Sequence, residues 1–186
     1  MAAKLFIVSA PSGAGKTTLV KELLTQCLGL VYSISHTTRN PRQGEVHGKD
    51  YFFTDTAQFM EMVESGQMLE WAQVHGNCYG TSASFVQERL AAGQSVLLDI
   101  DVQGGRQIMD FGLDFVSIFI MAPSLDVLEQ RLRGRGTDAE EVIRTRLENA
   151  KGEIAQRSFY THVVVNDVLD EAVAELLAIV EQETVN

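Results

Sequence analysis

The chain has 186 residues, of which 45% are hydrophobic and 22% are charged, and this composition predicts one compact globular unit with room for small inserted subdomains. The formal net charge of −10 argues against a general nucleic-acid-binding surface, which requires an excess of Lys and Arg. No apolar run approaches the roughly 20 residues that a membrane-spanning helix needs. We therefore expect neither nucleic acid nor a membrane as a partner.

The two cysteines, Cys27 and Cys78, occur without C-x-x-C spacing, so neither a zinc site nor a disulfide framework is indicated. Free thiols are typical of a reducing compartment. The residues before the first apolar run show no cleavable signal pattern. These features predict a cytoplasmic location.

The first predicted elements are a strand over residues 5–8 and a helix over residues 16–27, whose leucines recur on one face. The loop between them, residues 10–15, is rich in turn-forming residues. The backbone N–H groups of such a loop and the dipole of the following helix favour anionic oxygens. This order of strand, loop and helix predicts a phosphate-binding site.

The residues at the start of that helix make the prediction more specific. The sequence from Ala10 to Thr18, APSGAGKTT, follows the pattern G-x-x-x-x-G-K-[ST], except that Ala10 replaces the first glycine. In that pattern the lysine, here Lys16, reaches the β- and γ-phosphates, and the hydroxyl of Thr17 can bind Mg²⁺. An ordinary Gly-rich turn would not need Lys16 and Thr17 at the helix start, so we interpret the loop as a nucleoside triphosphate site.

A polar, irregular segment over residues 35–51 follows a short strand predicted at 31–34. Within it, Arg39 and Arg42 lie three residues apart, and Tyr51 lies beyond them. Two guanidinium groups and a phenol can bind one phosphate group, because Arg is suited to bidentate contacts. The alternative is a solvated basic loop with no ligand.

The next predicted elements are strands over 51–53 and 68–74 and helices over 56–65 and 83–92, with Thr56 and the segment 79–82 as helix caps. Glu70 lies between Leu69 and Trp71 in the second of these strands. Its carboxylate is either an exposed member of an alternating pattern or a buried acceptor, and the sequence leaves both interpretations open.

A buried strand over residues 96–98 ends in Asp99 and Asp101. In a parallel α/β sheet, ligands bind at the carboxyl ends of the strands. A carboxylate at that edge, together with a phosphate loop, is the expected partner of Mg²⁺ or its water shell. The alternative is that one of the two carboxylates caps a helix or a turn.

A short helix is expected after Gly104-Gly105, and a strand over 116–121 then leads to a helix over 125–132 with Ser124 as its cap. A further helix is expected to start at Thr137. The arginines of this region are Arg131, Arg133, Arg135, Arg144 and Arg146. Arg135 is flanked by glycines between two helices, which is typical of a lid that closes on phosphates. The alternative treats Arg133 and Arg144 as surface arginines paired with acidic neighbours.

The last predicted elements are a strand over 163–165 and an amphipathic helix over 171–183. Apolar runs that alternate with helices along the chain are typical of a parallel α/β sheet with helices on both faces. The five runs are 5–8, 31–34, 96–98, 116–121 and 163–165. This alternation predicts the fold class.

Taken together, these motifs resemble the guanylate kinase family of the nucleoside-monophosphate kinases. The motifs that carry the resemblance follow one another along nearly the whole chain: APSGAGKTT, SHTTRNPRQGEVHGKDYFF, YGTS, LLDIDVQG, RGRG and VND. The resemblance implies transfer of a phosphoryl group from ATP to GMP with Mg²⁺, giving ADP and GDP. The use of dGMP and the choice between a monomer and a homodimer stay open.

The resemblance also implies a P-loop kinase core (1–34, 83–123 and 156–186), a small mixed α+β GMP-binding insertion (35–82) and a helical lid (124–155). The ATP-binding positions are then Ala10, Pro11, Ser12, Gly13, Ala14, Gly15, Lys16, Thr17, Thr18, Arg131, Asn166 and Asp167. The GMP-binding positions are Ser35, Arg39, Arg42, Tyr51, Glu70, Tyr79, Thr81, Asp99 and Asp101. The catalytic positions are Lys16, Arg39, Asp99, Arg135 and Arg146, and the Mg²⁺ positions, direct or through water, are Thr17 and Asp99.

The chemistry of guanine agrees with this set. Its N1–H and N2–H₂ groups lie beside O6, so the Glu70 carboxylate can accept from both nitrogens, and the hydroxyls of Ser35 and Thr81 can donate to O6. Adenine reverses this pattern, and such a mismatch can discriminate by about 10⁴–10⁵. Two alternatives stay open: a P-loop kinase for another acceptor, and a non-catalytic binding module on the same fold.

Overall fold

The computed structural model describes residues 3–185 except 75, 111–112, 135 and 137. Its strands are β1 (Leu5–Ser9), β2 (Leu30–Tyr32), β3 (His36–Thr37), β4 (Phe52–Phe53), β5 (Met68–Val74), β6 (Asn77–Ser82), β7 (Ser95–Asp99), β8 (Phe115–Met121) and β9 (His162–Val165). Its helices are α1 (Lys16–Gln26), α2 (Thr56–Glu64), α3 (Ala83–Ala91), α4 (Val102–Asp110), α5 (Leu125–Gly134), α6 (Glu140–Ala155), the 3₁₀ helix η1 (Gln156–Phe159) and α7 (Leu169–Val185).

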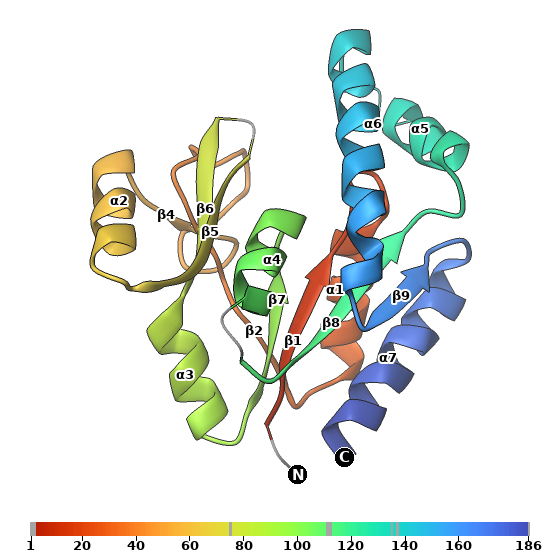
Figure 1. Cartoon of the computed structure of the whole chain (residues 1–186). Coiled ribbons are helices and arrows are strands. Elements are labelled where there is room, and N and C mark those ends of the chain that lie inside the picture. Colours follow the sequence, from red (N-terminus) through yellow and green to blue (C-terminus); the bar gives the residue numbers. More distant parts are fainter. Residues whose placement is uncertain (1–2, 75, 111–112, 135, 137, 186) are drawn as a thin grey trace.

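Five parallel strands form the central sheet in the order β2-β7-β1-β8-β9 (Figure 1). The prediction of a parallel α/β sheet built from the five apolar runs is therefore confirmed. All five residues of β1 are buried, because helices cover both faces of the sheet. A strand buried on both sides needs apolar residues at successive positions, which is why it appeared as a continuous apolar run.

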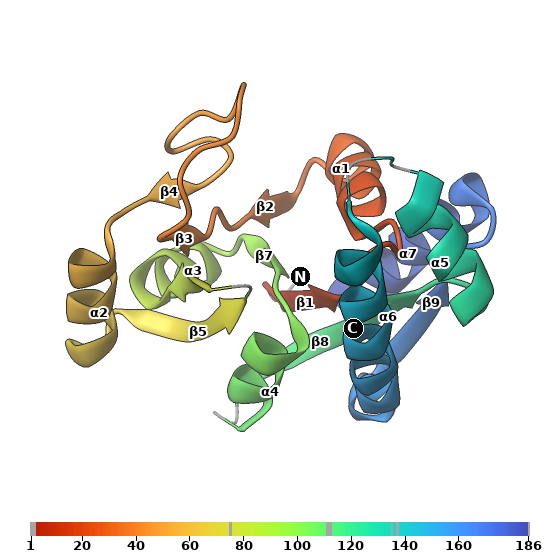
Figure 2. The ribbon, with the colours of Figure 1, turned by 90° about the horizontal axis from the view of Figure 1, so that it is seen from above.

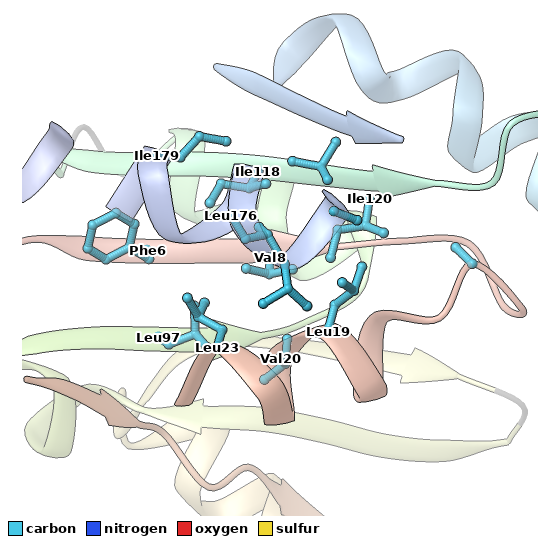
Figure 3. Close-up of a cluster of buried hydrophobic side chains, with 14 of the residues drawn as sticks. Phe6, Val8, Leu19, Val20, Leu23, Leu97, Ile118, Ile120, Leu176 and Ile179 are labelled. Carbon is cyan, nitrogen blue, oxygen red and sulfur yellow. The ribbon is translucent and has the colours of Figure 1, made fainter. Parts of the chain in front are cut away.

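Successive side chains of β1 point to opposite faces and join two different cores. Phe6 and Val8 pack with Leu19 and Leu23 of α1 and with Leu176 of α7 (Figure 3). On the other face, residues of β1 and β7 pack with side chains of α3 and α4, and the fully buried ones are Leu5, Ile7, Val96, Leu98, Val86 and Ile108. The two cores fix the carboxyl ends of β1 and β7 beside each other.

A second, smaller sheet has the order β4-β3-β6-β5. Its pairs are mixed: β3 and β4 run parallel, whereas β6 is antiparallel to both β3 and β5. α2 covers this sheet through Phe59, whose ring lies 6.3 Å from that of Trp71. The two views show this sheet and α2 on one side of the carboxyl ends of the large sheet, and α5 and α6 on the other side (Figures 1 and 2).

Two predicted helix starts are wrong in detail. α4 begins at Val102, so Gly104 and Gly105 lie inside the helix, where both are buried. The cap of α2 is Asp55, whose carboxylate accepts from the Gln58 N–H at 2.8 Å, and not Thr56. The predicted start at Thr137 lies outside the described residues, and α6 begins at Glu140.

Candidate active site

The loop between β1 and α1 is folded so that its backbone can surround an anion. The Ala14 N–H donates to the Pro11 carbonyl at 3.1 Å, and the Leu19 N–H donates to the Gly15 carbonyl at 3.2 Å. Gly13 and Gly15 have φ values of 93° and 90°, which residues with a side chain rarely adopt. Gly15 also occupies the N-cap of α1 and brings no side chain, so the first N–H groups of the helix stay available to an anion.

Residues far along the chain brace this loop. The Asn166 side chain, after β9, donates from Nδ2 to the Ala14 carbonyl at 2.8 Å. A Cβ on Gly15 would lie only 2.3 Å from that nitrogen. Arg131 of α5 donates from Nη2 to the Asn166 carbonyl at 2.9 Å. The structure thus brings Arg131 and Asn166 to the loop, while Asp167 is exposed beside them.

Lys16 and Asp99 form an ion pair at the carboxyl end of β7. The Lys16 ammonium also donates to the Ile100 carbonyl at 3.2 Å. Both groups line one pocket with Thr17, whose side chain is exposed. A carboxylate and a hydroxyl beside a phosphate loop are oxygen donors of the kind that Mg²⁺ prefers. Among the described residues there is no group of three or more His, Cys, Asp or Glu that could hold a metal ion.

That pocket has a volume of about 230 Å³ and joins the large sheet to the small one. It is lined from the core by Lys16, Thr17, Tyr32, Asp99, Ile100 and Asp101. Its other lining residues are Ser35, Tyr51, Glu70, Ala72, Val74, Tyr79 and Gly80. Residues that lie far apart in the sequence therefore share one cavity beside the phosphate loop.

Glu70 is a buried acceptor, which excludes the exposed alternative. Its side chain belongs to a residue that is 4% exposed, and its Oε1 accepts from the Thr81 hydroxyl at 2.6 Å. Burial raises the pKa of Glu70 from its ordinary value of 4.5 to about 7, and the charge of Asp101 acts in the same direction. The hydrogen bond from Thr81 opposes this rise. The group therefore titrates near neutral pH in the free protein.

Two aromatic rings form the adjoining wall, and one arginine that does not itself line the pocket lies against them. The rings of Tyr51 and Tyr79 meet edge to face at 6.0 Å, and burial raises the pKa of Tyr51. The Arg39 guanidinium lies 5.3 Å from the centre of the Tyr51 ring and pairs with Glu45 at 2.8 Å. Arg42 is exposed and is not among the residues that line the pocket.

The arginines of the predicted lid have different environments. Arg146 of α6 pairs with Asp138 at 3.1 Å and lies 3.5 Å from the Ser12 hydroxyl of the loop. Arg133 pairs with Glu129 and Glu140, so it is a surface arginine, as the alternative held. Arg135 lies outside the described residues.

Asp101 has two roles in the structure. It caps α4, because its Oδ1 accepts from the Gly104 N–H at 2.9 Å and its Oδ2 accepts from Gln103 at 3.0 Å. It also lines the pocket. The capping alternative is therefore right for Asp101, while Asp99 pairs with Lys16.

A family model described as guanylate kinase matches residues 2–183. The chain belongs to the guanylate kinase family. Guanylate kinases from Geobacter sulfurreducens and Chromobacterium violaceum are 48% and 49% identical to it over 179 residues, covering 96% of this chain and 88% and 85% of those proteins. A crystal structure of guanylate kinase from Anaplasma phagocytophilum is 33% identical, with a TM-score of 0.82, and covers 100% of this chain and 88% of its own.

Membership of the guanylate kinase family confirms the resemblance drawn from the motifs, the fold class and the assignment to the phosphotransferases. The substitution of Ala10 in the loop does not remove the chain from the family. The roles of individual residues and the borders of the insertion and the lid stay predictions. None of the described helices of this guanylate kinase family member is both long enough and apolar enough to span a membrane.

Sequence reasoning missed part of this guanylate kinase pocket. Tyr32 lines it from the last position of β2, and burial together with the charge of Asp99 raises its pKa. The strand was predicted over 31–34, which placed Tyr32 inside it, so its position at the carboxyl end of β2 became visible only in the structure. Ala72, Val74 and Gly80 had no such signal, because they enter the pocket only through the pairing of β5 with β6.

Proposed function

We propose that the chain catalyses the transfer of the γ-phosphoryl group from ATP to GMP, giving ADP and GDP. The observation that carries this proposal is a buried carboxylate, Glu70, which shares one pocket with the Lys16–Asp99 pair beside the phosphate loop. An acceptor for the donor edge of guanine thus lies next to a site for phosphates. Family membership supports the same reaction.

On the ATP side, the backbone of residues 10–15 and the ammonium of Lys16 would hold the β- and γ-phosphates. Thr17 and Asp99 would hold Mg²⁺, directly or through water, and the ion would supply charge neutralisation at the phosphate oxygens. The bond between the γ-phosphorus and the β-bridging oxygen breaks as the bond to a GMP phosphate oxygen forms. No covalent intermediate on the protein is needed, because this chemistry depends on positioning and electrostatics.

On the GMP side, Glu70 would accept from guanine N1–H and N2–H₂, with Ser35, Thr81 and Asp101 around the base. Ionised Glu70 is the form that accepts both bonds, so GMP binding favours loss of its proton. Thr81 donates to Glu70 in the free protein and thereby orients the carboxylate. This arrangement supports guanine over adenine as the base.

The GMP phosphate would lie against Tyr51 and Tyr79, with Arg39 beside them. Arg39 is already ordered by its ion pair with Glu45 and by its contact with the Tyr51 ring. Arg42 would have to turn inward from its exposed position. This side of the site therefore combines a preformed part with a part that moves on binding.

The remaining predicted roles belong to a lid over residues 124–155. Arg146 already reaches the loop at Ser12, and with Arg135 it would neutralise the transferring phosphoryl group. Arg131, Asn166 and Asp167 would border the adenine, because the first two already brace the loop. Residues 35–82 would form the GMP-binding part. The use of ATP and GMP pools agrees with a cytoplasmic location.

A coupled assay of ADP release with ATP and Mg²⁺ tests the proposal, with GMP, dGMP, AMP, UMP and CMP compared in parallel. We expect turnover with GMP and not with AMP, UMP or CMP. The reaction with dGMP shows whether the enzyme needs the 2′-hydroxyl of the acceptor. ADP release with another nucleotide but not with GMP would agree with the phosphate site and contradict guanine as the base that Glu70 binds. A folded protein that releases no ADP with any acceptor would favour the non-catalytic binding module.

A further inference from the structure

α4 connects the two halves of the pocket. It begins directly after Asp101, at the carboxyl end of β7, and packs against both β1 of the large sheet and β5 of the small sheet (Figures 1 and 2). β5 carries Glu70 and lies at the edge of its sheet. The position of this carboxylate relative to the phosphate loop therefore depends on what joins β5 to α4.

One connection is made by Gln107 of α4. Its side-chain Nε2 donates to the Trp71 carbonyl at 2.6 Å, and its Oε1 accepts from the Trp71 N–H at 3.1 Å. Trp71 follows Glu70, and both of these backbone groups face away from β6 on an edge strand. The amide of Gln107 thus makes the two bonds that a neighbouring strand would otherwise make.

The strand needs such a brace at this position. Its pairing with β6 shifts register between Met68 and Glu70, which leaves an irregularity next to the carboxylate. Irregularities of this kind disrupt the ladder locally and bend the strand. Bonds to α4 just beyond the irregularity fix the direction in which Glu70 points.

The second connection is made by Gly104, in the first turn of α4. A Cβ on Gly104 would lie 2.2 Å from Glu70 Oε2 and 3.0 Å from its Cδ. The carboxylate is therefore seated directly against the helix backbone, where no side chain fits. The N-terminal end of α4 also favours the ionised form of a carboxylate placed there.

We infer that Gln107 and Gly104 are positioning residues that set the base specificity of the pocket by holding Glu70 on α4. The inference rests on the proposed function, in which Glu70 binds the guanine edge. Neither residue contacts the reacting atoms. They act through the orientation of one carboxylate, whose displacement by about 1 Å can cost on the order of 10²-fold in rate.

The first test replaces Gln107 by Leu, which keeps the approximate volume and removes both hydrogen bonds. The matched control is Gln87→Leu, because Gln87 is an exposed residue of α3. For Gln107→Leu we expect the KM for GMP to rise about tenfold and the GMP-to-AMP ratio of kcat/KM to fall about tenfold. The KM for ATP should stay within about twofold of the wild type, and Gln87→Leu should match the wild type throughout.

The second test is Gly104→Ala, with Gly29→Ala as its control, because a Cβ on Gly29 would meet nothing within 4 Å. Alanine favours the helix more than glycine does, so this variant does not depend on weakening α4. We expect the same rise in the KM for GMP and the same loss of base preference. If Gln107→Leu does not fold, Gly104→Ala decides the inference.

Wild-type kinetics separate the inference from the function on which it rests. A wild-type protein that makes no GDP contradicts the proposed function. A wild-type protein that makes GDP, together with variants that melt earlier but keep the wild-type KM for GMP and the wild-type GMP-to-AMP ratio, shows a purely structural role and overturns the inference alone.

Discussion

The two sides of the pocket are built in different ways. On the side of the phosphate loop, six consecutive residues, 10–15, form one backbone turn, and one ion pair, Lys16–Asp99, supplies the charges. On the side of the small sheet, the groups are side chains that come from separate segments: Glu70 from β5, Tyr79 and Thr81 from β6, and Tyr51 from the residues before β4. The proposed phosphate site is thus local in the chain, whereas the proposed base site depends on tertiary packing.

The difference extends to protonation. Lys16 and Asp99 have each other as partners of opposite charge. Glu70 is buried with a hydroxyl as its hydrogen-bond donor and with Asp101 nearby, so its pKa rises to about 7. The charge on the small-sheet side of the pocket therefore changes near neutral pH, through the carboxyl group of Glu70.

The largest expected effect removes the charge on the phosphate side. Lys16→Ala should lower kcat by about 10²–10³ or more, because the ammonium stabilises charge that develops in the transition state. Lys21→Ala, an exposed lysine of the same helix, is the control and should keep the wild-type rate. Steady-state kinetics with GMP measures both. A wild-type rate for Lys16→Ala would refute the assignment of the loop.

The next largest effect is expected from a substitution on the small-sheet side of the pocket, where the guanine base is proposed to bind. Glu70→Gln should lower the GMP-to-AMP ratio of kcat/KM by about 10² or more, because the amide cannot accept from both N1–H and N2–H₂. Glu64→Gln, at an exposed site on α2, is the control. The KM for ATP should change little. An unchanged preference for GMP would show that Glu70 does not contact the base.

Stability should depend on pH through the same residue. The pKa of Glu70 is about 7 in the folded protein and near 4.5 when exposed, so the folded state binds the proton more tightly. The stabilisation that the protonated Glu70 gives to the folded state is therefore complete below about pH 4.5. It is lost as the pH rises to about 7, and above that the free energy of unfolding no longer changes through this group. The total loss is at most about 3 kcal/mol.

Glu70→Gln removes this titration. Urea unfolding of the wild type and the variant at pH 5 and pH 8 should show a variant that gains relative stability at the higher pH. A difference between the two proteins that is independent of pH would contradict the buried, protonated carboxyl group. The GMP affinity of the wild type should likewise weaken as the pH falls below 7.

The smallest expected effect concerns motion on the phosphate side. ATP should slow hydrogen exchange in α5 and α6, because Arg146 and Arg131 already reach the loop and its brace and would gain phosphate contacts. GMP alone should change exchange mainly in residues 35–82. Exchange in α5 and α6 that does not respond to ATP would argue against a lid.

Much of the fold was predictable because the core strands are buried on both faces. β1 is apolar at its first four positions, and α1, which packs on it, shows leucines at regular spacing. β3 and β6 were not recognised, because a two-residue strand has no periodicity and NCYGTS has no apolar alternation. The small sheet is specified by its pairing with neighbours more than by its own sequence.

The sequence by itself determined the loop, with Lys16 and Thr17 placed by their spacing, and the family, through ordered motifs. Only the tertiary structure decided that Glu70 is buried, that Asp101 caps α4, that Tyr32 enters the pocket and that Gln107 braces Trp71. The physical reason is the distance along the chain over which the interactions act. A backbone turn that binds phosphate is specified by neighbouring residues, whereas burial and long-range hydrogen bonds depend on which segments the fold brings together.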